Sequence, residues 1–180
     1  MAITIKRPEG VVELCTDLAL RSDWESAVAD LDEARKSRSD RLVDLSVAEL
    51  AERVIALESA MSEVTHVFRL RAIPRRRWQE LVLELPARDG NAVDESMGVD
   101  HSRFFDAVLM EPGAVFAVVE KVSGKPVAFD PAKDWQELAD EMTDAQWNDF
   151  ASKVLELNRG VTSVPKSLLA SRLTGISAEK

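Results

Sequence analysis

A segment of alternating apolar and basic residues constrains the fold of this chain more than any other part of it. Phe68, Leu70 and Ala72 alternate with Arg69 and Arg71. A period of two predicts a strand with one buried face. Because a single strand cannot stand alone, the segment predicts a small antiparallel sheet, for which the N-terminal residues offer a partner.

The same segment continues through Pro74 into a predicted helix. Proline suits the first turn of a helix, and Trp78 begins an apolar stripe that ends before Pro86. The first turn then contains Arg75, Arg76 and Arg77. The helix dipole disfavours cations there, so helix stability alone does not explain three arginines. We expect them to meet acidic groups, either the chain's own carboxylates or those of a partner.

The N-terminal third predicts a β-hairpin followed by a helical hairpin. Strand-like runs at 2–6 and 11–16 flank Pro8-Glu9-Gly10, which has the residues of a turn. Two capping-box patterns, Ser22 with Glu25 and Ser46 with Glu49, precede apolar residues at helical spacing. The second helix has a heptad seam, which predicts packing against the first helix, with a free coiled-coil dimer as the alternative. The seam consists of Val47, Leu50, Val54, Leu57, Met61 and Val64.

The second half reads as mainly helical. Residues 87–100 predict a long surface loop, and Ser102 is placed to cap a helix containing Phe104 and Phe105. Runs at 115–122 and 126–129 predict a second β-hairpin, with helix as the competing interpretation of the first run. Later helices are predicted to begin at Asp130-Pro131 and at the capping box of Thr143 with Gln146, the last one ending at a left-handed Gly160.

These patterns predict a mainly α fold with a small antiparallel β-sheet (α+β), built as a helical hairpin plus a C-terminal helical bundle. We expect three segments. Residues 1–73 hold the β-hairpin, the helical hairpin and a third strand; residues 74–160 form a mainly helical core domain; residues 161–180 are an extended tail with an apolar side.

Charge and composition exclude several classes of protein. The chain has a formal net charge of -9, although residues 64–90 and 158–180 are each net positive. An acidic total disfavours general nucleic-acid binding, since phosphate contacts need concentrated cations. The apolar runs are far shorter than the roughly 20 residues of a membrane-spanning helix. No secretory signal is visible, so we expect a cytoplasmic protein.

Catalysis, metals and cofactors are also not expected. One cysteine and two histidines are too few for a Cys/His zinc site, and residues 87–100 lack the ligand spacing of a calcium loop. No nucleophile elbow, phosphate loop or dinucleotide fingerprint is present. A binding or assembly role remains.

An ordered series of short motifs makes this expectation specific. The series is Val67–Trp78, Gly98-Val99-Asp100 leading to Phe104-Phe105-Asp106-Ala107, Trp135, Met142–Trp147, Leu157-Asn158-Arg159-Gly160 and Val164-Pro165-Lys166-Ser167. In this order the chain resembles the tail assembly chaperones of long-tailed (siphovirus-type) bacteriophages, especially those that infect actinobacteria. The resemblance covers roughly residues 64–172, and 112–129 match it less well.

The resemblance implies a non-catalytic protein of the host bacterial cytoplasm. It would bind the tape measure protein and keep it soluble during tail tube assembly, with the tail tube protein, a frameshifted longer form of itself and a homo-oligomer as further partners. The alternatives are a structural virion component, such as a head–tail connector or tail completion protein, and a nucleic-acid-binding regulator. The expected partner-binding residues are Arg69, Arg71, Arg75, Arg76, Arg77, Val164, Pro165, Lys166 and Leu168.

Overall fold

The computed structural model describes residues 5–36 and 45–160, which form four strands and seven helices. The elements are β1 (Glu9–Cys15), α1 (Leu18–Lys36), α2 (Leu45–Glu63), β2 (Thr65–Arg71), α3 (Arg75–Glu84), α4 (Ala92–Met97), α5 (His101–Leu109), β3 (Val115–Glu120), β4 (Pro126–Val127), α6 (Pro131–Asp140) and α7 (Asp144–Arg159). The mainly α fold with a small antiparallel sheet is confirmed.

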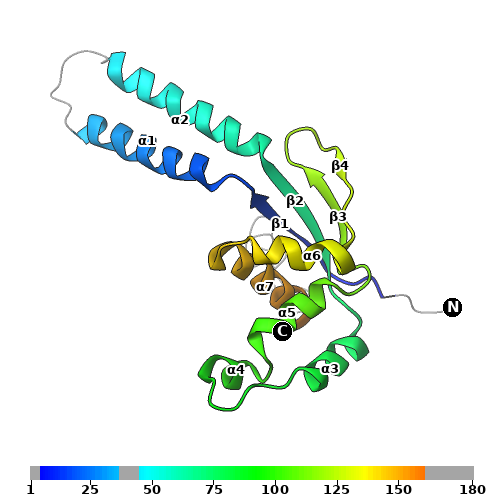
Figure 1. Ribbon diagram of the computed structural model, residues 1–180. Helices are drawn as coiled ribbons and strands as arrows, with labels where there is room; N and C mark the ends of the chain where they lie inside the picture. Colours follow the sequence, from blue (N-terminus) through cyan, green and yellow to red (C-terminus); the bar gives the residue numbers. More distant parts are fainter. Residues whose placement is uncertain (1–4, 37–44, 161–180) are drawn as a thin grey trace, which may run out of the picture.

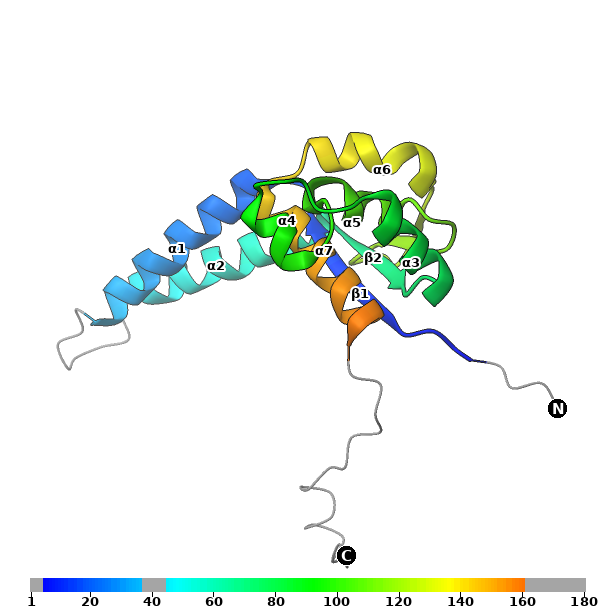
Figure 2. The same ribbon diagram turned by 90° about the horizontal axis from the view of Figure 1, so that it is seen from below.

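The four strands form one antiparallel sheet in the order β1-β2-β3-β4. Alternate residues of β1 and β2, among them Val12, Leu14, Phe68 and Leu70, are buried. Helix α7 packs against β1 and β2 on this side, as Figure 2 shows. The predicted strand at 68–72 and the hairpin at 115–129 are therefore present, the latter as β3 and β4. Strand β2 belongs to the predicted segment 1–73 and pairs with β3 of the segment 74–160. One core cluster contains residues of both segments.

The prediction of an N-terminal β-hairpin is wrong. Glu9 and Gly10 belong to β1 and pair with Arg71 and Leu70, so they form no turn. Residues 5–8 have no strand assignment, and residues 1–4 lie outside the described part. All seven residues of β1 are in register with β2, and this pairing between distant segments cannot be recognised from local turn residues.

Helices α1 and α2 form an arm that projects from the body of the molecule (Figure 1). The predicted helical hairpin is correct, and the apolar seam of α2 is half-buried against α1. Both predicted caps are misplaced. Helix α1 begins about one turn earlier than predicted, at Leu18, and is capped by Asp17, whose Oδ1 accepts hydrogen bonds from the backbone N–H groups of Ala19 and Leu20. Ser46, the predicted cap of the second helix, lies inside α2, which includes Leu45 before it.

The core of the body is aromatic. Phe68 packs edge-on against Phe129 and Phe150, and Phe150 in turn packs against the fully buried Trp135. The carboxylate Oδ1 of Asp106 accepts hydrogen bonds from the indole N–H groups of Trp135 and Trp147, each at 2.9 Å. One carboxylate on α5 therefore joins α6 and α7 to the centre of the fold.

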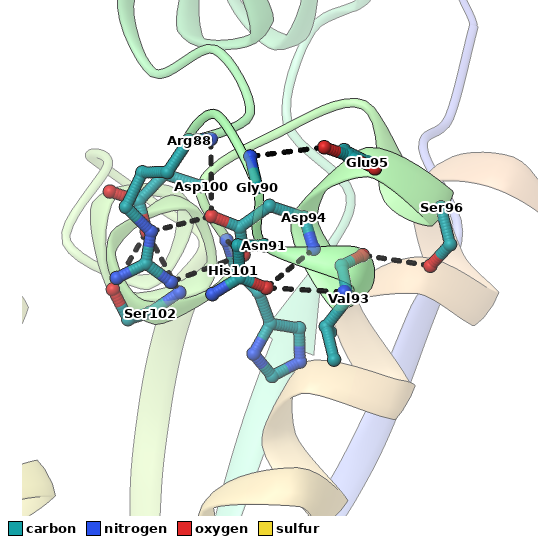
Figure 3. A network of polar contacts seen from close by, with 10 residues as sticks. All are labelled: Arg88, Gly90, Asn91, Val93, Asp94, Glu95, Ser96, Asp100, His101 and Ser102. Carbon is teal, nitrogen blue, oxygen red and sulfur yellow. Dashed lines mark hydrogen bonds and ion pairs between the residues drawn. The ribbon is translucent and has the colours of Figure 1, made fainter.

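The predicted surface loop at 87–100 instead folds around a buried carboxylate (Figure 3). Asp94, on the short helix α4, is 0% exposed and accepts hydrogen bonds from Arg88 and from the backbone N–H of His101. The Arg88 guanidinium is the main cause that lowers the pKa of Asp94 to about 2. The buried Asp94 carboxylate, paired with the half-exposed Arg88 and bound by backbone donors, holds the connection between α3 and α5 in place.

Two other predicted helix ends are corrected, and two are confirmed. The N-cap of α5 is Asp100, which accepts hydrogen bonds from both the backbone and the hydroxyl of Ser102. Gly160 has a φ of -63° instead of the left-handed conformation. The capping box of Thr143 with Gln146 is present at the start of α7, and Asp130 caps α6 as predicted.

Candidate partner-binding surface

The sheet is covered by α7 on one side, and its other side is the open face. We define the open face by Val11, Glu13, Val67, Arg69, Arg71, Phe116, Ala117 and Val119. Val11 is opposite Arg69, which is opposite Ala117, and in the next row Glu13, Val67 and Val119 are neighbours. These residues alternate with the buried ones, so their side chains point away from α7.

Apolar side chains remain accessible on the open face. Val11 is 53% exposed and Phe116 is 36% exposed, while Val67 and Val119 are half-buried. Phe116 lies at an irregularity between β2 and β3, where Leu70 faces Val115 and Arg69 faces Ala117. An unpaired residue at such a bulge redirects its side chain. This places the Phe116 ring beside Arg71, with the guanidinium carbon 4.4 Å from the ring centroid.

Arg69 is exposed at the centre of this face. Its side chain makes no hydrogen bond or ion pair with another residue in the described ranges. Arg71 differs, because its guanidinium binds Glu9 Oε1 at 2.8 Å and stacks on Phe116. Lys121 and Glu13 form a further pair at 2.6 Å. The open face therefore offers an uncommitted cation among apolar side chains, with the neighbouring charges already paired.

The three arginines at the start of α3 do not act as a group. Arg75 is exposed, and Arg76 is paired with Glu80 one turn later, with 92% of its own side chain exposed. Arg77 donates to Glu111, at the end of α5, and to Glu80 and Glu84. These hydrogen bonds, to Glu84 first and Glu111 second, raise the pKa of Arg77.

Arg77 therefore joins α3 to α5. The sequence left two explanations for the arginines between Arg69 and Arg77, namely pairing with the chain's own carboxylates or with those of a partner. The first explanation applies to Arg71, Arg76 and Arg77.

The structure places five of the predicted site residues, in two locations. Arg69 and Arg71 lie on the open face, and Arg75 to Arg77 lie at the start of α3. Val164, Pro165, Lys166 and Leu168 are outside the described residues. Sequence reasoning missed Val11 and Phe116. The alternation of β1 contained the signal for Val11, whereas the bulge that exposes Phe116 has no sequence signature in this chain.

Within residues 5–36 and 45–160, no group of three or more His, Cys, Asp or Glu side chains is arranged to hold a metal ion. No described helix combines the length and apolar character needed to cross a membrane. Comparison of the chain with protein-family models, with curated proteins and with solved structures finds no match.

Proposed function

We propose that this protein is a tail assembly chaperone of a long-tailed bacteriophage, which works without catalysis in the host cytoplasm. It binds the tape measure protein and keeps that protein's helices from aggregating until tail tube subunits assemble around them. The open face of the sheet is the client surface, and its one-sided coverage is the observation on which this proposal depends.

Contacts among the motifs of the resemblance support the proposal. Asp106 of the Phe104–Ala107 motif binds the indoles of Trp135 and Trp147. Asn158 Oδ1 accepts a hydrogen bond from the backbone N–H of Ile73 at 3.0 Å. The guanidinium of Arg159 lies 5.5 Å from the Trp78 ring centroid. Motifs far apart in the sequence thus stabilise one fold together, as expected if they are the signature of a family.

The chemistry of the open face suits an amphipathic client helix. Val11 and Phe116 offer apolar contact area, and Arg69 offers a cation for a carboxylate beside the apolar stripe of the client. The surrounding acidic surface, with a chain net charge of -9, would keep a coated client soluble.

Co-expression with an amphipathic helical fragment of the tape measure protein tests the proposal. Arg69→Glu removes one attraction and adds one repulsion, each worth up to about 1 kcal/mol at an exposed site, so we expect the dissociation constant to rise about 5- to 30-fold. The matched control is Arg103→Glu, an exposed arginine of α5 outside the open face.

Equal retention of the client by Arg69→Glu and Arg103→Glu would exclude the open face. Failure of the unmodified chain to hold the fragment in solution would exclude the function itself. If the protein is instead a virion component, mass spectrometry of purified particles will find it in stoichiometric amounts. If it is a nucleic-acid-binding regulator, a mobility shift that weakens steeply with salt will appear.

A further inference from the structure

Among residues 5–36 and 45–160, no strand pairs with the outer edge of β1. Backbone hydrogen bonds join Ala72 N to Pro8 O at 3.0 Å and Thr16 N to Val64 O at 3.1 Å, one at each end of the β1–β2 ladder. In an antiparallel pair the bonded residues alternate, so the even-numbered residues of β1 face β2. The N–H and C=O groups of Glu9, Val11 and Glu13 therefore point away from the sheet.

The residues before β1 have the features of a strand that is not paired. Ile5 is 82% exposed. Arg7 and Pro8 are fixed in line with β1, because Arg7 Nη1 donates to the carbonyl of Ala72 and the Ala72 N–H donates to the carbonyl of Pro8. Residues 5–8 therefore do not cover the outer edge of β1. This edge can pair with the edge of another molecule.

We propose that two copies of the chain pair through this edge, with residues 5–11 of each copy antiparallel about a two-fold axis at Pro8. In this register Ile5 is opposite the partner copy's Val11, and Arg7 is opposite its Glu9. The odd-numbered residues of both copies face each other, which yields about eight backbone hydrogen bonds. The result is a continuous eight-stranded sheet with an isologous interface.

The side chains favour this register. Ile5 and Val11, two of the exposed large hydrophobic residues, become a cross-strand pair, and Arg7 faces a carboxylate. Pro8, which has no N–H, lies at a position that needs no N–H toward the partner. A hollow of about 620 Å³ lined by Ile5, Lys6, Arg7, Glu9 and Arg71 lies beside this edge.

The position of α7 argues against an alternative dimer in which the β1 strands of the two copies lie side by side over their whole length. Helix α7 follows β1 from Cys15, whose carbonyl accepts from Gln146 Nε2 at 2.8 Å, to Gly10, beside Leu157. In-register strands would lie about 4.8 Å apart with both copies of α7 beneath them, although packed helices need about 8–10 Å. The register centred on Pro8 staggers the two helices along the strands and avoids this overlap.

Cross-linking of the full-length chain tests the register. In a Cys15→Ser background, Pro8→Cys creates a symmetric non-hydrogen-bonded pair with Cα atoms about 4.5 Å apart, within the range of a disulfide. Lys6→Cys is the control, because its symmetry mates are four residues out of register, about 13 Å apart. We expect a disulfide-linked dimer from Pro8→Cys under mild oxidation. Equal or faster cross-linking of Lys6→Cys would overturn the register.

Sedimentation equilibrium tests the interaction itself. We expect the unmodified chain to dimerise and Ile5→Asp to raise the dimer dissociation constant at least about tenfold, since it places a carboxylate opposite Val11 in both halves of the interface. Leu83→Asp is the matched control, with an equal exposure of 82% on α3. A chain that stays monomeric at about 100 μM, or an Ile5→Asp variant that dimerises like the control, would refute the proposal.

Discussion

Replacement of Asp106 by alanine should destabilise the protein more than any other single carboxylate change on α5 to α7. The carboxylate Oδ1 accepts two indole N–H groups, from Trp135 and Trp147, each at 2.9 Å. A hydrogen bond to a charged group contributes about 1.5–3 kcal/mol, and Trp135 is fully buried, so its N–H finds no water after the change. We expect Asp106→Ala to lower the free energy of unfolding by about 3–5 kcal/mol.

Two further variants separate the hydrogen bonds from the loss of a charge. Asp106→Asn keeps an acceptor oxygen at the same place, so we expect a loss of only about 1–2 kcal/mol. Asp149→Ala, at an exposed position of α7, should stay within about 0.5 kcal/mol of the unmodified protein.

Equilibrium unfolding in urea, followed by circular dichroism and tryptophan fluorescence, measures all three variants. If Asp106→Ala costs less than about 1 kcal/mol, or if Asn and Ala cost the same, the paired indole contacts do not stabilise the fold as inferred.

Three other changes test separate parts of the structure. Thr143→Ala removes the capping box of α7 and should cost about 1 kcal/mol, whereas Ser22→Ala, inside α1, should leave stability unchanged or raise it by about 0.5 kcal/mol in the same urea assay. Phe150→Ala opens the aromatic core and should cost about 3–5 kcal/mol by thermal or urea unfolding. The pKa of Asp94 is lowered from 3.8 to about 2, so the stabilisation by its carboxylate is complete above about pH 4 and is lost as the pH falls toward 2. Over that interval the difference in urea midpoint between the unmodified protein and Asp94→Asn should shrink.

Local signals predicted most of the elements. The alternation in Phe68 to Ala72, the proline before α3 and the capping box at Thr143 all depend on neighbours in the sequence, and the structure contains each of them. Ser22 with Glu25 has the same pattern, yet α1 begins at Leu18, because Asp17 caps the helix directly after the end of β1. A capping pattern shows where a helix is able to start, and the preceding strand decides where it does.

Contacts between distant residues were beyond the reach of sequence patterns. Residues 87–100 contain acids and glycines, which is typical of a surface loop, but Asp94 is buried because Arg88 and the backbone of His101 satisfy its oxygens. Arg77 likewise belongs to the cationic cluster by sequence and to the α3–α5 junction by structure, since Glu111 lies 34 residues away. Whether a charge is free or paired depends on the fold. The sequence therefore reveals the cluster of arginines, but it does not reveal that Arg69 is the unpaired arginine on the sheet.

The face and the edge of the sheet offer different chemistry, so variants centred on one or the other separate the two proposals. Client binding is centred on open-face side chains such as Arg69 and Phe116, whereas self-association is centred on the outward backbone groups of Glu9 and Val11; the Val11 side chain, at the rim of the face, is the one residue that both use. Arg69 is on β2, one strand in from the edge, so Arg69→Glu should weaken client binding and leave the dimer constant within about threefold. Disulfide-linked Pro8→Cys should retain client binding, because the cross-link lies on the α7 side of the sheet. Loss of both properties in either variant would mean that face and edge form a single site.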